Sequence, residues 1–138
     1  MIILLDLNYT LVENSDEKHR PFAKQIEAER YRGWLVELVK PYRVILMTAR
    51  PAMHKDATLA SIHDKTGWLP QEAYFNAYGL TPPLAKERML NEHVRPNHGH
   101  THYLAIESNP ATRGMYEKYG IRAVKVEKGQ QWKELPIP

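Results

Sequence analysis

The chain has 138 residues, a formal net charge of +3 at pH 7 and no cysteine. Its length suits one domain, expected to span residues 1–138, and 43% hydrophobic with 25% charged residues is ordinary globular composition. No apolar run approaches the roughly 20 residues of a membrane helix, so we expect no membrane span. No basic region is followed by an apolar stretch and a cleavage site, so we expect no signal peptide and a cytoplasmic protein. The lack of cysteine excludes disulfides and thiolate metal sites. A pI of about 9.1 favours anionic partners, although a solvated basic surface explains it equally well.

Strand and helix patterns alternate along the chain. The apolar run at residues 2–5, IILL, is typical of a strand buried on both faces. Helical spacing of apolar residues predicts a helix over residues 26–39. Further strands are expected at 42–48, 72–78, 101–108 and 121–127, and further helices at 54–69, 82–94 and 109–120. This order predicts an α/β three-layer sandwich with a mostly parallel, five-stranded Rossmann-like sheet and no large cap domain.

Polar residues end three of the predicted strands. Asp6 follows the first strand, Thr48 ends the second and Glu107 follows the strand YLAI. Ligands of open α/β sheets bind beyond the carboxyl ends of the strands, so we expect these three side chains to share one crevice.

The same segments resemble the motifs of the haloacid dehalogenase-like (HAD) superfamily. LLDLNYTL is similar to its first motif, Asp-x-Asp-x-Thr/Val, and ILMTAR to its second. Lys86 in LAKERML suits the third motif, with Lys55 as a competing candidate, and YLAIESNP lies where the acidic fourth motif belongs. The order covers residues 2–126 and is most similar to small capless phosphatases and the phosphatase module of phage-type polynucleotide kinases.

The resemblance implies a role for each matching residue. Asp6 would be the nucleophile that forms an aspartyl-phosphate. The catalytic set would be Asp6, Asn8, Thr48 and Lys86. Substrate contacts would come from Tyr9, Thr10, Thr48, Ala49, Arg50 and Lys86. Mg²⁺ would be held by Asp6, the backbone carbonyl of Asn8 and Glu107, because oxygen ligands suit this cation. The expected partner is a nucleotide or a phosphorylated nucleic-acid end.

Two of the motifs depart from the family pattern. The acid that normally protonates the leaving oxygen is replaced by Asn8, and an amide does not shuttle protons at pH 7. Losing a general acid–base costs about 10²–10⁴ in rate. The fourth motif carries Glu107, Ser108 and Asn109 in place of one or two aspartates. The sequence therefore keeps residues that bind phosphate and Mg²⁺ but lacks the proton donor.

Three explanations stay open. The protein hydrolyses a phosphate slowly, or one with a good leaving group. Alternatively, it is an inactive HAD-derived nucleotide-binding protein, for example a phage sponge that sequesters a nucleotide immune signal. Thirdly, Asn8 was engineered to trap a substrate. A homo-oligomer would be compatible with each, because an open site can be completed by a second subunit.

Other features carry weaker functional interpretations. Alternating histidines can bind Zn²⁺ or Ni²⁺, and the candidates are His93, His98, His100 and His102. Early basic residues either form a rim that attracts phosphate or a solvated face: Lys18, His19, Arg20, Lys24, Arg30 and Arg32. Tyr74, Phe75 and Tyr78 line the mouth of the site or belong to the core. The tail, with ELPIP at residues 134–138, is expected to be irregular.

Overall fold

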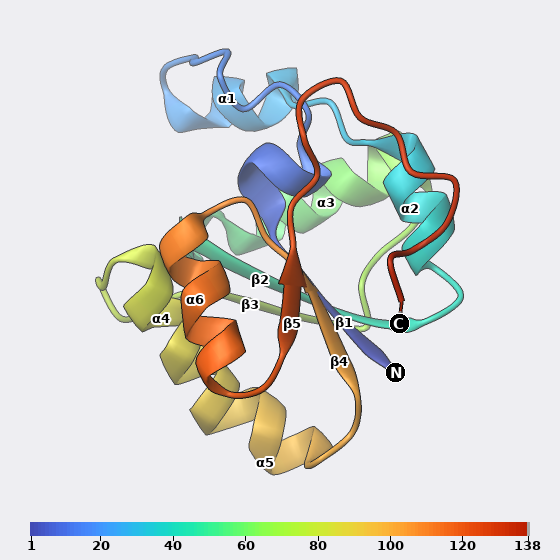
Figure 1. Ribbon diagram of the computed structural model, residues 1–138. Coiled ribbons are helices and arrows are strands. Elements are labelled where there is room, and N and C mark those ends of the chain that lie inside the picture. The colour runs from blue at the N-terminus through green and yellow to red at the C-terminus, as the bar shows by residue number, and fades with distance from the viewer. Residues whose placement is uncertain (138) are drawn as a thin grey trace.

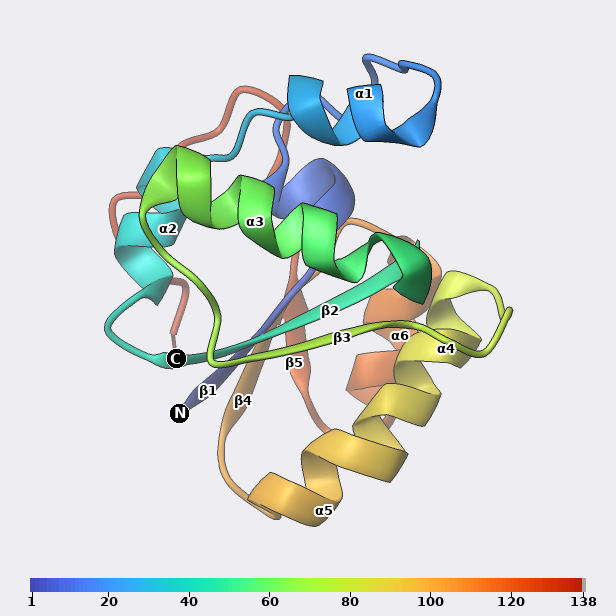
Figure 2. The ribbon, with the colours of Figure 1, turned by 180° about the vertical axis from the view of Figure 1, so that it is seen from behind.

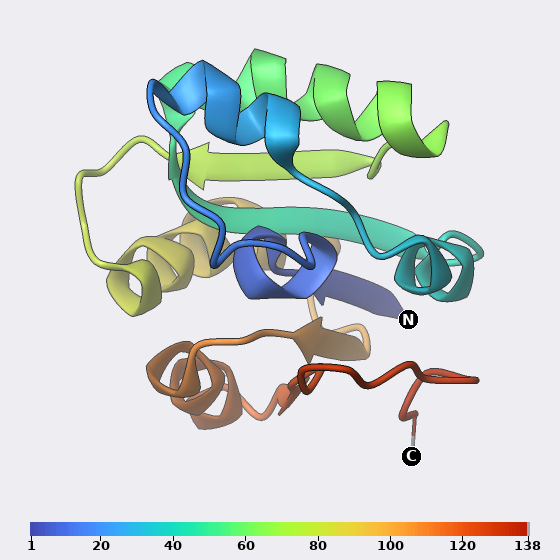
Figure 3. The same ribbon diagram turned by 90° about the horizontal axis from the view of Figure 1, so that it is seen from above.

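A central parallel sheet organises the fold (Figure 1). The computed structural model describes residues 1–137. The strands are β1 (Ile2–Leu5), β2 (Arg43–Pro51), β3 (Glu72–Asn76), β4 (Tyr103–Ile106) and β5 (Arg122–Val124). They pair in the order β3-β2-β1-β4-β5 (Figure 3), and every pairing is parallel. This confirms the predicted α/β class with a Rossmann-like sheet.

Helices cover both faces of the sheet, which gives three layers (Figures 1 and 2). One face carries α1 (Phe22–Ala28), α2 (Gly33–Val39) and α3 (Lys55–Thr66). The other carries α4 (Pro82–Met89), α5 (Arg95–His98) and α6 (Pro110–Lys118). Short turns are η1 (Leu7–Leu11), η2 (Ala52–His54) and η3 (Leu90–Val94), of which η3 joins α4 to α5. Within residues 1–137 there is no cap domain, as the sequence predicts.

Side-chain alternation along β1 divides the core in two. Ile3 and Leu5 belong to the cluster under α2 and α3. Ile2 and Leu4 belong to the cluster under α4 and α6. Successive strand residues point to opposite faces, so Asp6 continues the series of Ile2 and Leu4 toward α4. By the same alternation Glu107 follows Ala105, which lies in that second cluster.

The helix predicted over residues 26–39 is wrong, because the structure contains two helices there. Glu29 ends α1 in an extended conformation, and Tyr31 pairs with Val12 in an isolated antiparallel bridge. The amide of Arg30 donates to the side chain of Asn14 at 2.7 Å. These contacts with the segment after β1 outweigh the helical spacing, which sequence alone cannot weigh against them.

Other boundaries differ by a few residues. The second strand continues past Thr48 to Pro51, with an irregular register between Met47 and Pro51. The start of α6 agrees with the sequence: Asn109 caps it by accepting from Ala111 N at 2.9 Å. The C-terminal segment has no regular structure but is packed, since Trp132 contacts Trp34 at 5.7 Å between ring centroids. Across residues 1–137, no helix has the length and apolar character needed to cross a bilayer.

Candidate functional site

The predicted residues meet at the carboxyl edge of the sheet. Leu5 lies in register with Leu46 of β2 and Ile106 of β4. The residues that follow, Asp6 and Glu107, therefore leave the sheet side by side, and Thr48 lies at the same edge on β2. All three are nearly inaccessible to solvent.

The turn η1 surrounds Asp6 with the backbone of the next residues. Its backbone closes through Val12 N donating to Leu7 O at 2.9 Å. Tyr9 adopts a φ of +61°, a left-handed conformation that costs most residues free energy and suits glycine. The Tyr9 amide donates to Ser15 Oγ at 2.7 Å, and the Arg32 guanidinium donates to the carbonyls of Tyr9 and Thr10. These bonds hold a strained turn directly after the candidate nucleophile.

Lys86 of α4 joins the two carboxylates. Its Nζ lies 2.7 Å from Asp6 Oδ1 and 2.6 Å from Glu107 Oε1. We call these three residues the Lys86 cluster. The opposite oxygen of Asp6 accepts from Thr10 Oγ1 at 2.9 Å and from Ser108 Oγ at 2.8 Å. Each acidic oxygen is thus held by a donor, which fixes the orientation of Asp6.

The charges in this cluster do not balance, and the pKa values reflect that. Burial opposes ionisation of Asp6, but the Lys86 ammonium and its hydrogen bond keep the pKa of Asp6 below its ordinary value. Burial, followed by the Asp6 carboxylate, raises the pKa of Glu107 to about 7 despite Lys86. Burial opposes the charge of Lys86 as well, yet the two carboxylates raise its pKa. Because two carboxyl groups share one ammonium group, a further cation would be electrostatically favourable here.

The fourth-motif segment supports this cluster in ways the sequence did not show. Ser108 bridges Asp6 and the carbonyl of Asn8, the latter at 3.2 Å. The Asn109 amide donates to Glu107 Oε2 at 3.1 Å. Arg113 Nη1 donates to the carbonyls of Glu107 and Ser108 at 3.1 and 2.8 Å. The sequence could not show the bond from Ser108 to Asp6, because these residues are 102 positions apart in the chain.

The oxygens here fit a hard divalent cation. Asp6, Glu107 and the Asn8 carbonyl supply carboxylate and carbonyl oxygens, the ligand types that Mg²⁺ takes. The raised pKa of Glu107 indicates negative charge that a cation would offset. Within residues 1–137, no group of three or more His, Cys, Asp or Glu side chains is arranged to hold a metal. A cation at this edge would therefore depend on two carboxylates, one backbone carbonyl and water.

Arg50 forms a second buried cluster with Glu29, Thr58 and the Asn8 side chain, which we call the Arg50 cluster. Arg50 Nη1 lies 3.0 Å from Glu29 Oε1 and 2.9 Å from Thr58 Oγ1, and Nη2 pairs with the other Glu29 oxygen. Nη2 also donates to Asn8 Oδ1 at 3.0 Å. The Asn8 side chain is therefore held on the Arg50 side, away from Asp6. Glu29 was not singled out in the sequence, because its pairing depends on the break between α1 and α2.

The remaining predicted site residues lie near these clusters. Thr48 accepts from the Arg50 amide at 3.1 Å through Oγ1, which leaves its hydroxyl hydrogen for another acceptor. Ala49 lies between them and is partly exposed. Tyr9, in the turn η1, is 48% exposed. Lys86, and not Lys55, is the lysine bonded to Asp6.

The weaker candidates separate into different regions. His98 Nε2 lies 2.6 Å from Glu72 Oε2, and the His93 ring stacks on Tyr74 with 4.9 Å between ring centroids. These two histidines therefore pack against residues of β3. Phe75 is a core residue. The early basic set also divides, because Arg30 pairs with exposed acids and Arg32 is buried beneath the turn η1.

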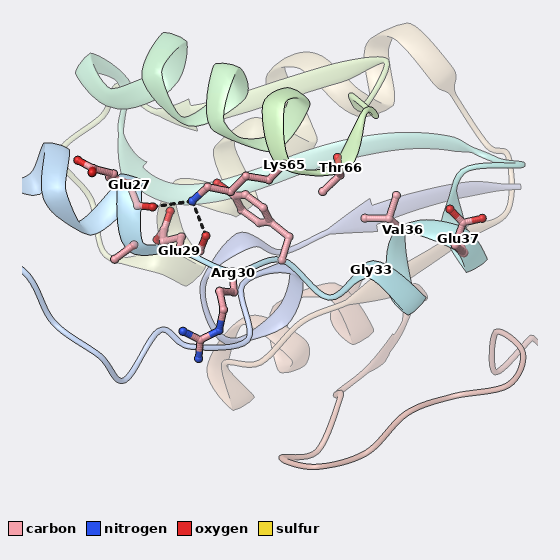
Figure 4. Close-up of a pocket in the computed structure, with 10 residues that line it drawn as sticks. Glu27, Glu29, Arg30, Gly33, Val36, Glu37, Lys65 and Thr66 are labelled. Carbon is pink, nitrogen blue, oxygen red and sulfur yellow. Dashed lines mark hydrogen bonds between the residues drawn. The ribbon is translucent and has the colours of Figure 1, made fainter.

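A cavity of about 570 Å³ lies beside α1 and α2 (Figure 4). Of the residues in the Lys86 and Arg50 clusters, Glu29 alone lines it. Lys65 lines this cavity, and its Nζ donates to the carbonyls of Glu27 and Glu29 at 2.7 and 2.6 Å. These bonds satisfy two carbonyls at the end of α1, where the Glu29 amide also donates to Ile26 O. We interpret this cavity as a structural junction between α1 and α3.

Comparisons with known proteins support the fold. No protein-family model matches the chain, and no curated protein matches it either. The chain is similar to one chain of the solved Pnkp1/Rnl/Hen1 RNA repair complex, with a TM-score of 0.72 at 13% sequence identity. The match covers 94% of this chain but 43% of the other, so it spans less than half of that longer protein. At this identity the likeness establishes a shared fold.

Proposed function

We propose that this chain is a HAD-type, Mg²⁺-dependent phosphohydrolase that acts on the phosphate of a nucleotide or a nucleic-acid end. The observation that carries the proposal is the Lys86 cluster, in which a buried lysine orients Asp6 beside a second carboxylate. The motif order LLDLNYTL, ILMTAR, LAKERML and YLAIESNP supports it, as does structural similarity to a chain of an RNA repair complex.

Asp6 is the proposed nucleophile. Its depressed pKa keeps the carboxylate ionised at neutral pH, and its bonds to Lys86, Thr10 and Ser108 set its direction. An Asp6 oxygen forms a bond to phosphorus while the bond from phosphorus to the leaving oxygen breaks. Water then attacks the aspartyl-phosphate and releases phosphate, which regenerates Asp6.

The other residues hold the transferred phosphoryl group. Lys86 places positive charge beside Asp6, and the hydroxyl hydrogen of Thr48 is available to an equatorial oxygen. Asp6, Glu107 and the Asn8 carbonyl would hold Mg²⁺, which when bound supplies positive charge against the phosphate. Without such a cation the ionised Asp6 would repel an anionic substrate.

Protonation of the leaving group is the weak step. Asn8 has no ionisable proton, and its side-chain oxygen is held by Arg50 at 3.0 Å. We therefore expect slow turnover of alkyl phosphates and faster turnover when the leaving oxygen is a weak base. The same observation favours a second candidate function, capture of a nucleotide without hydrolysis.

A turnover assay with Mg²⁺ separates the two. p-Nitrophenyl phosphate and 3′- and 5′-nucleotides are incubated with the wild-type protein and the Asp6→Asn variant, and phosphate release is measured. The hydrolase predicts release that requires both Mg²⁺ and Asp6. No release from any substrate, together with stoichiometric nucleotide binding in calorimetry, removes the hydrolase and leaves the binding protein.

A further inference from the structure

The Arg50 guanidinium has one donor that no described residue satisfies. Arg50 is 3% exposed, and its Nη atoms bond Glu29, Thr58 and Asn8. Its Nε is buried, with no hydrogen-bond partner in the structure. Burying an N–H donor without an acceptor is unfavourable, because the donor loses its bond to water and gains none in the protein. Nε and Nη2 form one edge of the guanidinium. On this edge the Asn8 amide oxygen accepts a hydrogen bond from Nη2 but none from Nε.

Arg50 also lines a cavity of about 580 Å³ between α1 and the segment after the turn η1. Its lining residues are Asn8, Ser15, Lys18, His19, Arg20, Pro21, Phe22, Gln25 and Arg50. The lining contains three basic side chains besides Arg50 and no acidic one. We call this space the Arg50 cavity.

Acidic residues that adjoin the lining in sequence, or that bond Arg50, already pair with cations. Glu17 bonds Arg30 at 3.0 Å, and Asp16 lies 3.9 Å from Lys128. Both carboxylate oxygens of Glu29 pair with Arg50. Positive charge from Lys18 and Arg20 is therefore not offset within the lining itself.

The side-chain oxygens of Ser15, Gln25 and Asn8 in the lining each already accept one hydrogen bond. Ser15 Oγ accepts from Tyr9 N at 2.7 Å, and Gln25 Oε1 accepts from His19 N at 2.8 Å. Asn8 Oδ1 accepts from Arg50. The Ser15 hydroxyl hydrogen and the side-chain amide hydrogens of Asn8 and Gln25 remain to donate. A space that offers donors and cations is complementary to an anion.

Asn8 lies between this cavity and the Lys86 cluster. Its backbone carbonyl faces Ser108 at 3.2 Å, next to Asp6, whereas its side chain faces Arg50. We propose that the Arg50 cavity binds a second phosphate of the same substrate whose first phosphate lies at Asp6. The proposal rests on the proposed function for the first phosphate. It narrows the substrate class to molecules with two phosphates close together, either a nucleoside bisphosphate or an oligonucleotide end.

Calorimetry with paired ligands tests the proposal. A nucleoside 3′,5′-bisphosphate is compared with the matching 3′- and 5′-monophosphates in Mg²⁺, with chromatography to check that each ligand stays intact. We expect the bisphosphate to bind at least about tenfold more tightly than either monophosphate, as charge-assisted hydrogen bonds would give. We call the Kd of the tighter-binding monophosphate divided by the Kd of the bisphosphate the affinity ratio. The Lys18→Ala/Arg20→Ala variant should reduce this ratio to about one to two, while monophosphate affinity changes little.

The matched control is Arg122→Ala/Lys133→Ala, which removes the same charge from exposed positions outside the cavity. It should retain the wild-type ratio. A ratio near one in the wild-type protein, or an equal loss in both double variants, overturns the proposal. A pentanucleotide with a terminal phosphate distinguishes the sources: tighter binding than the bisphosphate indicates a nucleic-acid end, and weaker binding a free nucleotide.

Failure of the proposed function gives a different result. If monophosphate binding requires neither Mg²⁺ nor Lys86 but the bisphosphate still depends on Lys18 and Arg20, the first phosphate site is wrong and the Arg50 cavity stands. If monophosphate binding requires Mg²⁺ and Lys86, but the ratio of monophosphate to bisphosphate Kd is the same without Lys18 and Arg20, the cavity proposal is wrong and the hydrolase stands.

Discussion

Lys86 and Arg50 are both buried cations, yet their surroundings differ. Lys86 comes from α4 on one face of the sheet and contacts two carboxylates. Arg50 contacts Thr58 of α3 on the opposite face and has one carboxylate partner, Glu29. The Lys86 cluster therefore has excess negative charge, and the Arg50 cluster has an N–H donor without an acceptor.

This difference indicates what each cluster can accept. Excess negative charge favours a cation, and an unsatisfied donor favours an anionic oxygen. Asn8 connects the two, with its carbonyl toward one cluster and its amide toward the other. A substrate with a metal-bound phosphate and a second phosphate would satisfy both.

The largest expected effect comes from Asn8→Asp, which introduces an ionisable carboxyl where the proposed function requires a proton donor. To act there, this side chain must turn from Arg50 toward the leaving oxygen. Turnover of a nucleotide should rise by about 10²–10⁴, because its alkoxide leaving group needs a proton. p-Nitrophenyl phosphate, whose leaving group is a weak base, should gain far less. Steady-state kinetics of the two substrates measures the contrast. Equal gains, or none, would show that Asn8 does not limit the leaving-group step.

Breaking the Arg50 cluster should cost stability. Glu29→Gln leaves a buried guanidinium without its countercharge, and we expect the free energy of unfolding to fall by about 3–5 kcal/mol. The matched change Glu13→Gln breaks an exposed pair with Arg30 and should cost about 0–1 kcal/mol. Urea denaturation measures both. Similar losses would contradict the claim that Arg50 depends on a buried partner.

The Lys86 cluster predicts a pH dependence for Mg²⁺ binding. The pKa of Glu107 is raised to about 7, so below that pH a proton must leave before a cation binds. Apparent Mg²⁺ affinity should fall about tenfold per unit as the pH decreases below 7, and level off above it. Calorimetry between pH 5.5 and 8.5 tests this. Glu107→Gln should bind Mg²⁺ weakly with little pH dependence; an unchanged profile would separate Glu107 from the metal.

The smallest effect is expected at the cavity beside α1 and α2. Lys65→Met removes donors to the carbonyls of Glu27 and Glu29 but no contact with Asp6 or Arg50. We expect a loss of about 0.5–1.5 kcal/mol in stability. Mg²⁺ and nucleotide affinities should stay within about twofold, since they depend on charge outside this cavity. A large drop in nucleotide affinity would make this cavity part of the site.

Sequence predicted the layers well because strand alternation and helix caps are local signals. The run IILL and the order of predicted strands and helices were sufficient for the α/β class and the sheet edge. The convergence of Asp6, Thr48 and Glu107 followed from parallel register alone.

The parts that sequence missed depend on distant contacts. The break after α1 is set by pairing with Val12 and Asn14, and it is this break that brings Glu29 to Arg50. The bond from Ser108 to Asp6 likewise joins residues that are 102 positions apart in the chain. No local pattern encodes such pairings. The side-chain direction of Asn8, toward Arg50, could not be deduced from its place in the motif either.

The most direct measurement is a crystal structure of the protein soaked with MgCl₂ and beryllium fluoride, a phosphoryl mimic. The account predicts a cation ligated by Asp6, Glu107 and the Asn8 carbonyl, with the fluoride adduct on the second Asp6 oxygen and Lys86 beside it. A cation bound elsewhere, or an adduct that does not involve Asp6, would contradict the central claim that the strand ends form a metal-dependent phosphate site.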